Sequence, residues 1–263
     1  MSSAFVELGN LFELNEFFEF DEFELIIGTP ASEQLNGTEN NEVIIGLRGA
    51  DTINSNGGFD LLFGNRGNDT IAGGSESNFI FGGPGRDTIY ANGGWNILIG
   101  GPGADRIHGS NQSDFILGGS GRDIIYANGG GDFIAAGRGA DKIYGSNQAD
   151  IILGGSGKDT IYANGGDDLI DGGDGIDTIW LSGDETVVLD ANNSKYDIIK
   201  NFQLGRTTFV VNDLENLNVQ GSSDGAKIYQ GNNLLATVSW QSASVFENNI
   251  NDIFVTEIDE VVV

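Results

Sequence analysis

The sequence predicts an all-β protein whose chain winds into a solenoid of two parallel sheets, and three observations support this fold class. An acidic residue recurs every nine residues, a glycine-rich stretch precedes each one, and an apolar residue follows two places later. A fixed period of this kind is typical of repeat architectures, in which each unit packs against its neighbours.

The nine-residue spacing runs without interruption from residue 51 to residue 177. Thirteen of the fifteen positions are Asp and two are Asn, and Glu42 lies one step upstream. The positions are Asp51, Asp60, Asp69, Asn78, Asp87, Asn96, Asp105, Asp114, Asp123, Asp132, Asp141, Asp150, Asp159, Asp168 and Asp177. Chance does not produce such a register, so the acidic residues must serve the repeat itself.

Each unit reads G-G-x-G-x-D-x-U-x, where U is apolar, and divides into a six-residue turn and a three-residue strand. Neighbouring strand residues point to opposite faces, so U faces the core and its two flanking residues face outward. Two units then make one coil of 18 residues. The predicted core residues are Ile53, Leu62, Ile71, Ile80, Ile89, Leu98, Ile107, Ile116, Ile125, Ile134, Ile143, Ile152, Ile161, Ile170 and Ile179.

The turns combine carboxylates with glycine, and this composition favours binding of a hard cation. Glycine lets a turn adopt positive φ and direct carbonyl oxygens inward. The next coil lies about 4.8 Å away, so carboxylates and carbonyls of two coils would form an all-oxygen cage. Calcium, which takes six to eight flexible oxygen ligands, fits such a cage better than magnesium. Stacked Asp residues about 5 Å apart would repel one another without the ion.

The unit resembles the RTX (hemolysin-type) calcium-binding repeat. Five stretches match its pattern throughout: GGPGRDTIY (82–90), GGPGADRIH (100–108), GGSGRDIIY (118–126), GGSGKDTIY (154–162) and GGDGIDTIW (172–180). The resemblance covers residues 46–180 and implies a parallel β-roll with calcium held in the turns between successive coils. It also implies secretion or display at a bacterial cell surface.

The two units of a coil differ, which predicts unequal calcium binding along the two edges. Eight units keep the glycines, and their Asp residues give seven vertically adjacent pairs, hence up to about seven ions. We expect calcium ligands from this glycine-side column, which is Asp51, Asp69, Asp87, Asp105, Asp123, Asp141, Asp159 and Asp177. The second column has poorer turns and is interrupted by Asn78 and Asn96. Its candidate ligands are Asp60, Asp114, Asp132, Asp150 and Asp168.

The outward positions next to the second column are apolar in thirteen of fourteen cases. A sheet that is apolar on both faces must be covered on both, and a bare strip of this length exceeds the patches that monomers tolerate. The N-terminal segment, the C-terminal cap or a second copy of the chain could cover it. We expect a homodimer, a larger assembly or a protein partner to pack against Phe79, Phe81, Ile97, Ile99, Phe115, Leu117 and Phe133.

The outward positions of the glycine side carry a column of aromatic residues: Tyr90, His108, Tyr126, Tyr144, Tyr162 and Trp180. Such a column could bind sugar, which makes a calcium-dependent carbohydrate-binding module the alternative function. Stacked aromatic residues also stabilise a sheet without binding anything.

The repeat divides the chain into three regions. Residues 1–27 hold six of the 16 phenylalanines and seven acids, as expected of a cap over the first coil or a docking segment. Residues 28–181 form the array, and residues 182–263 read as short strands of a β cap. DIIKNFQLG (197–205) and QGNNLLATVSW (230–240) are similar to caps that follow RTX arrays in bacterial, notably cyanobacterial, proteins. The final Glu260–Val263 looks like the terminal motif of type I secretion substrates.

Composition narrows the possible functions. The chain has 39 acidic and 12 basic residues, and its net charge of −27 repels nucleic acid and anionic membranes and attracts cations. It has no cysteine, and no apolar run approaches the roughly 18 residues of a membrane helix. The first basic residue is Arg48, so a cationic N-terminal signal region is not expected. No catalytic constellation is visible, and we expect a non-enzymatic protein with a structural or interaction role.

Overall fold

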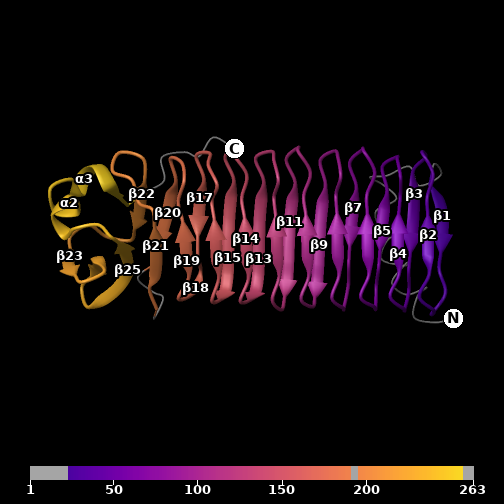
Figure 1. Cartoon of the computed structure of the whole chain (residues 1–263), viewed down its shortest axis with the longest axis horizontal. Coiled ribbons are helices and arrows are strands. Elements are labelled where there is room, and N and C mark those ends of the chain that lie inside the picture. Colours follow the sequence, from indigo (N-terminus) through magenta and orange to yellow (C-terminus); the bar gives the residue numbers. More distant parts are fainter. Residues whose placement is uncertain (1–22, 191–194, 257–263) are drawn as a thin grey trace.

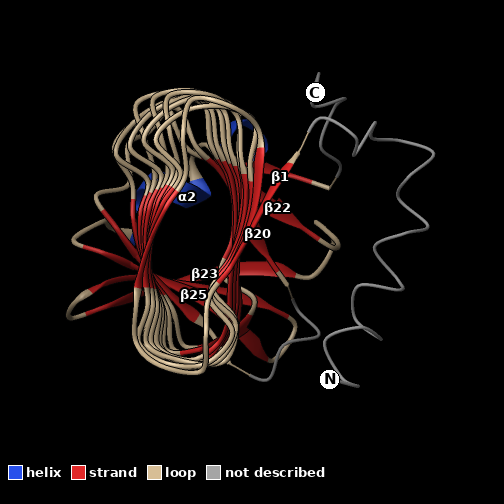
Figure 2. Ribbon diagram, turned by 90° about the vertical axis from the view of Figure 1, so that its right-hand side faces the viewer, coloured by secondary structure: helices blue, strands red, loops and turns tan. Residues whose placement is uncertain are grey.

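The structure is a computed structural model and describes residues 23–190 and 195–256. The chain winds into a long solenoid whose strands lie side by side along its axis (Figure 1). Seen along this axis, two sheets face each other and turns join them at both edges (Figure 2). The predicted all-β parallel β-roll is confirmed.

Among the described residues, each sheet contains thirteen strands. Sheet A contains, in spatial order, β1 (Glu24–Ile27), β3 (Glu42–Ile45), β5 (Leu61–Phe63), β7 (Phe79–Phe81), β9 (Ile97–Pro102), β11 (Phe115–Ser120), β13 (Phe133–Gly139), β15 (Ile151–Gly157), β17 (Leu169–Asp171), β20 (Thr186–Leu189), β22 (Thr208–Val211) and β26 (Phe254–Val255), with β18 (Asp174–Gly175) beside β15. Sheet B contains β2 (Gln34–Asn36), β4 (Thr52–Asn54), β6 (Thr70–Ala72), β8 (Thr88–Tyr90), β10 (Arg106–His108), β12 (Ile124–Tyr126), β14 (Lys142–Tyr144), β16 (Thr160–Tyr162), β19 (Thr178–Trp180), β21 (Asp197–Lys200), β25 (Asn233–Ser239), β24 (Gly225–Gln230) and β23 (Leu217–Ser222).

The core is a single stack of apolar side chains between the two sheets. Parallel pairing places each core residue opposite the one 18 positions later, as Ile116 opposite Ile134 and Ile107 opposite Ile125. All fifteen predicted core residues are fully buried. Each such side chain contributes about 1.5–3 kcal/mol, but a stack this thin leaves much of the cohesion between coils to the turns.

The fourth residue of the glycine-side unit is glycine because the coils approach closely there. A Cβ placed on Gly103 would lie 1.6 Å from the carbonyl oxygen of Gly85, and one on Gly85 would lie 1.4 Å from that of Gly67. The Gly103 N–H also donates a hydrogen bond of 2.7 Å to the Ser120 carbonyl of the next coil. The backbones therefore pack against each other in the turns, and any side chain at this position would separate them.

The sheets continue past residue 181, where the nine-residue repeat ends. Strands β20, β22 and β26 extend sheet A, and β21 and β25 extend sheet B. The antiparallel strands β23, β24 and β25, with the short helices α2 (Ala243–Glu247) and α3 (Ile250–Ile253), form the end of the molecule (Figure 1). A cluster of aromatic residues fills the interior there: Phe202, Phe209, Phe246 and Phe254.

At the other end, coils begin before the glycine-rich repeat becomes regular. Strand β1 starts at Glu24 and pairs in register with β3, so Glu24 lies opposite Glu42. Of the predicted N-terminal segment 1–27, residues 1–22 lie outside the described residues, as does the predicted secretion motif Glu260–Val263. Across residues 23–190 and 195–256, we find no helix with the length and apolar character that crossing a membrane requires.

We expect Gly103→Ala to lower the free energy of unfolding by about 3 kcal/mol, the upper end of the range for overpacking. The cause is the clash of the new Cβ with the Gly85 carbonyl. Gly129→Ala is the matched control, because its Cβ would meet nothing closer than 3.4 Å. Denaturant unfolding in saturating calcium measures both variants, and equal stability of the two would contradict the steric explanation.

Candidate functional site

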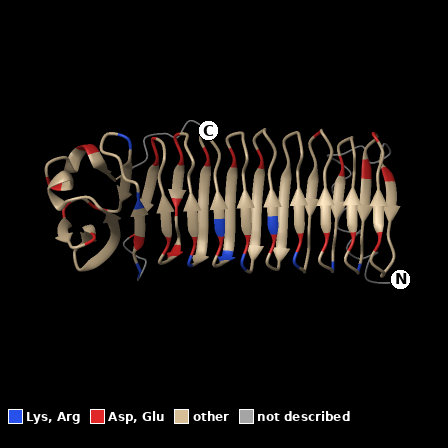
Figure 3. Cartoon of the chain, in the orientation of Figure 1, with Lys and Arg blue, Asp and Glu red and all other residues tan. Residues whose placement is uncertain are grey.

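Two columns of acidic side chains run along the two edges of the solenoid. Asp and Glu recur at the ends of successive strands on both edges, while Lys and Arg of the array gather along the lower edge in the same view (Figure 3). Every Asp and Asn in the two columns, from Asp51 to Asp177, has at most 2% of its surface exposed. Buried acids at this density need partners, because an isolated charge in a protein interior is very costly.

One oxygen of each carboxylate is used to hold two coils together. Asp123 Oδ1 accepts a hydrogen bond of 2.7 Å from the backbone N–H of Asp105, and Asp141 Oδ1 accepts one of 2.7 Å from that of Asp123. The glycine-side column repeats this bond from Glu33 to Asp177. In the second column, Asn78 and Asn96 accept the same bond through their side-chain oxygens. The repeated acid therefore fixes the register of the coils, in addition to carrying a carboxyl group into each turn.

The other carboxylate oxygen is buried and has no partner along the whole glycine side. Among the described residues, the following carboxylate oxygens are buried without a hydrogen bond: Oδ2 of Asp51, Asp60, Asp69, Asp87, Asp105, Asp123, Asp132, Asp141, Asp159, Asp168 and Asp177, and Oε2 of Glu42 and Glu185. Native proteins leave few buried polar atoms unpaired, so a regular row of them points to a ligand.

On the glycine side, unpaired carboxylate oxygens lie close to carbonyl oxygens of the next coil. A Cβ placed on Gly82 would lie 2.6 Å from Asp87 Oδ2 and 2.8 Å from the Gly100 carbonyl oxygen. The same point on Gly64 lies 2.6 Å from Asp69 Oδ2 and 2.7 Å from the Gly82 carbonyl oxygen. The first glycine of these units thus lies beside an unpaired carboxylate oxygen and a carbonyl oxygen of the next coil. A cation is the ligand that resolves such an arrangement.

The electrostatics of these positions agree with the geometry. Burial, opposed in part by the hydrogen bond to Oδ1 and reinforced by neighbouring acids, raises the pKa of Asp87, Asp123 and Asp159 to about 7. The same causes raise the pKa of Asp132 and Asp168 to about 8. Without a cation, these carboxylates resist ionisation at neutral pH, so a bound cation would favour their charged form.

No three acidic or imidazole side chains converge on one point within the described parts of the chain. A cation in these turns would therefore take some of its ligands from backbone carbonyls. Such a mixed set of hard oxygen ligands suits calcium.

The comparison with protein families agrees with this chemistry. The family model of the RTX calcium-binding nonapeptide repeat matches residues 36–71, 72–107, 108–143, 126–160 and 144–179. These matches together span more than half of the 263 residues. The chain belongs to the RTX calcium-binding repeat family. A comparison with curated proteins found no match. Membership of this family implies that the chain binds calcium through its repeats.

The second column of the RTX array differs from the glycine side in its hydrogen bonds. In the turns G-S-N-Q-x-D, the Ser110 N–H donates to Asp114 Oδ2 and the Ser146 N–H to Asp150 Oδ2, both at 2.7 Å. Asp114 and Asp150 therefore have both carboxylate oxygens satisfied by the protein. Asp60, Asp132 and Asp168 retain an unpaired oxygen.

Both columns of the RTX array extend further than the sequence pattern indicates. Glu185, with 1% of its surface exposed, follows Asp168 in the second column, and its Oε2 is unpaired. Asp197 follows Asp177, whose N–H donates to Asp197 Oδ1 at 3.3 Å. Burial and the nearby Asp177 raise the pKa of Asp197 to about 8. Sequence analysis missed both because the spacing changes to 17 and 20 residues, although each acid keeps an apolar residue two places later.

The outward aromatic column of sheet B is a continuous stack. From Tyr90 to Tyr162, neighbouring ring centroids lie 4.7–4.9 Å apart with planes within 15° of parallel. The rings cover one another's faces and turn their edges outward. A sugar that stacks on an aromatic face has no open face inside this column, which disfavours the carbohydrate alternative.

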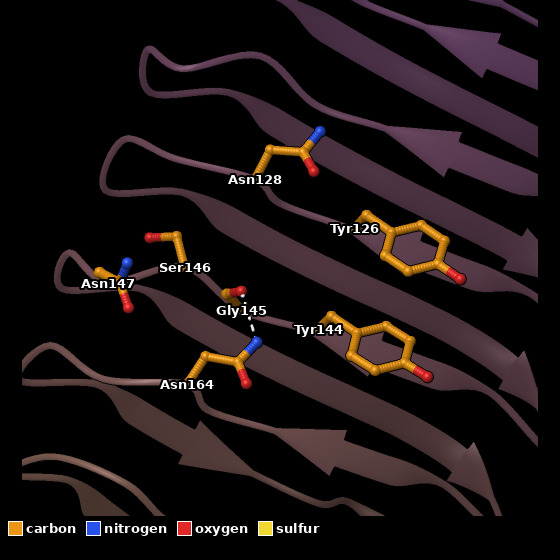
Figure 4. A pocket seen from close by; sticks show the side chains of 7 residues that line it. All are labelled: Tyr126, Asn128, Tyr144, Gly145, Ser146, Asn147 and Asn164. Atoms are coloured by element: carbon orange, nitrogen blue, oxygen red, sulfur yellow. Dashed lines mark hydrogen bonds between the residues drawn. The ribbon is translucent and has the colours of Figure 1, made fainter.

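An open hollow lies between the aromatic column and the turns of the second column. It is lined by Tyr126, Asn128, Tyr144, Gly145, Ser146, Asn147 and Asn164 (Figure 4). Equivalent residues 36 positions earlier line a second hollow. Asn164 has a left-handed φ of 70° and donates from Nδ2 to the Gly145 carbonyl at 3.0 Å, as Asn128 does to Gly109 at 2.8 Å. These amides therefore connect successive coils.

The predicted apolar strip lies on the outer face of sheet A. Its seven predicted residues, from Phe79 to Phe133, are all partly exposed. Phe115 and Phe133 stack with centroids 4.8 Å apart and planes 4° from parallel. The strip is thus an ordered surface of side chains from consecutive coils.

Proposed function

We propose that this protein is a non-enzymatic, calcium-stabilised β-roll that acts outside the cell or at its surface as a structural or interaction module. The observation that carries the proposal is the row of buried, unpaired carboxylate oxygens facing turn carbonyls. A secreted or surface location is inferred from membership of the RTX family. The single histidine stacks between Tyr90 and Tyr126, and the repeated acids hold the coils in register, so these groups have structural roles.

We assign the ligand role to the glycine-side column first. Its eight Asp residues, Asp51, Asp69, Asp87, Asp105, Asp123, Asp141, Asp159 and Asp177, each offer an unpaired Oδ2. Up to about seven ions, one for each adjacent pair, would then lie along this edge. In the second column, Asp60, Asp132 and Asp168 have the same unpaired oxygen, whereas Asp114 and Asp150 are weaker candidates. Bound calcium would supply the positive charge that lets the stacked carboxylates ionise together.

Calcium should drive folding of the chain. Without the ion, the stacked acids repel one another along each edge and the core is thin, so metal binding becomes part of the folding free energy. We expect little β signal by circular dichroism in chelator and a cooperative gain at roughly 0.1–1 mM calcium, the range of extracellular modules. A chain that is fully folded in chelator would contradict this prediction.

Asp123→Ala should lower the number of bound calcium ions by about two. Asp123 lies between Asp105 and Asp141 in the glycine-side column, so it would contribute a ligand to two adjacent ion sites between coils. Asn78→Ala is the matched control, because Asn78 occupies a column position without offering a carboxylate, and it should cost almost no calcium. Equilibrium dialysis with metal analysis counts the ions. Equal losses in the two variants would refute the assignment of the ligands to the glycine side.

We infer that the apolar strip of sheet A pairs with a second copy of the chain. Its residues Phe79, Phe81, Ile97, Ile99, Phe115, Leu117 and Phe133 are uncharged, on a chain with a net charge of −27. Two copies repel each other over most of their surfaces, so a neutral strip is where they can meet. The named residues lie on four strands, and the fourteen outward positions of sheet A from β5 to β17 occupy seven rungs. Seven rungs at about 4.8 Å give a length of roughly 30 Å, and two-fold pairing matches such a strip with itself.

The double variant Phe79→Glu with Phe115→Glu should convert the assembly to monomers. Carboxylates on the strip would be buried facing each other across the two-fold interface, which is strongly unfavourable. Light scattering in saturating calcium measures the mass of the wild type and the variant. Monomers in both cases would mean that no second copy covers the strip.

A further inference from the structure

The side-chain amide of Asn96 occupies an unusual position in the second column. Asn96 is fully buried. Its Nδ2 donates to the carbonyl oxygens of Gly93 and Gly94, both at 2.8 Å, and to Asp114 Oδ1 at 2.9 Å. Two turn carbonyls and a carboxylate of the next coil are the kinds of oxygen that a cation would need in this position.

Comparison with neighbouring turns shows that a nitrogen replaces the unpaired oxygen of an Asp. A Cβ placed on Gly73 would lie 2.9 Å from Asn78 Nδ2 and 2.9 Å from the Ala91 carbonyl oxygen. In the glycine-side turn, the same point on Gly82 lies 2.6 Å from Asp87 Oδ2 and 2.8 Å from the Gly100 carbonyl oxygen. Asp to Asn thus places a donor nitrogen where the glycine-side turn has an unpaired acceptor oxygen.

The Asn96 amide makes the same inter-coil hydrogen bond as the acid, but it leaves no unpaired oxygen for a cation. Asn96 Oδ1 accepts the N–H of Asn78 at 2.8 Å, and the Asn96 N–H donates to Asp114 Oδ1 at 2.8 Å. On the far side of Asp114, the Ser110 N–H satisfies Oδ2. The Asn96–Asp114 step is therefore fully hydrogen-bonded by the chain itself.

We propose that the Asn96 amide takes the place of a calcium ion, so that the stacking of the coils through Asn78, Asn96 and Asp114 is independent of metal. This inference rests on the proposed calcium binding of the RTX repeats. It makes the second edge a mixed one, in which the chain's own donors close some turns and the unpaired oxygens of Asp60, Asp132 and Asp168 leave others open.

Asn96→Asp tests this directly by restoring the carboxylate. The new Oδ2 would face the carbonyls of Gly93 and Gly94 and the carboxylate of Asp114, which are all acceptors, until a cation enters. We expect one additional calcium ion per chain in equilibrium dialysis. We also expect melting temperature to rise more steeply with the logarithm of calcium concentration, because unfolding then releases one more ion.

Two control variants separate the amide's role from charge and packing. Asn96→Ala removes the donor without adding a carboxylate, so it should lower the melting temperature at every calcium concentration and leave the ion count unchanged. Asn111→Asp adds the same charge at an exposed position of the adjoining turn, and should change neither the count nor the slope.

The inference is wrong if Asn96→Asp folds in calcium but binds no more ions than the wild type. It is also wrong if Asn96→Ala binds an additional ion, since that would mean that the amide blocks the site only sterically. Should Asn96→Asp not fold, Asn78→Asp gives the same count at the neighbouring position, where the amide donates to the Glu76 carbonyl at 2.9 Å. A wild type without bound calcium would instead overturn the proposed function itself.

Discussion

The structure depends on a buried carboxylate whose two oxygens have different tasks. One oxygen accepts a backbone N–H from the neighbouring coil and fixes the register, as between Asp105 and Asp123. The other remains unpaired beside turn carbonyls. The first task is completed within the protein, and we assign the second to a bound cation. A fold built on this residue therefore joins inter-coil pairing to the proposed metal binding wherever the second oxygen is unpaired.

The remaining features follow from how closely the coils must approach for that bond to form. A carbonyl of one coil occupies the space where a side chain on the next would begin, so glycine is required at positions such as Gly103. The core is thin, because each repeat unit contributes one large apolar side chain to it. Coils of this kind add almost identical increments to stability, because each contacts only its neighbours. The last coil therefore needs a different structure to cover its open end. Here the aromatic cluster around Phe209 and Phe246 closes it.

The buried acceptor oxygens have different partners along the two edges of the solenoid. On the glycine side, one oxygen of each carboxylate is buried without a hydrogen bond. On the second edge, Asn96, Ser110 and Ser146 supply donors from the chain. The exchange of one oxygen for an amide nitrogen is enough to change a turn from one type to the other. On a chain with a net charge of −27, each turn whose acceptors are satisfied by the chain's own donors needs one bound cation fewer.

The sequence by itself determined the period, the core and the acidic columns, because a nine-residue register is a local property that counting reveals. Ile53, Ile89 and the other core positions followed directly from strand alternation. Only the tertiary structure decided which carboxylate oxygens are unpaired, because Asp114 and Asp123 look alike until the Ser110 N–H is placed beside one of them. It also decided that Glu185 and Asp197 continue the columns, since spacings of 17 and 20 residues break the register in the sequence while sheet pairing restores it in space. Hydrogen bonds between coils join residues 16 or more positions apart, and such partners are fixed by stacking rather than by local pattern.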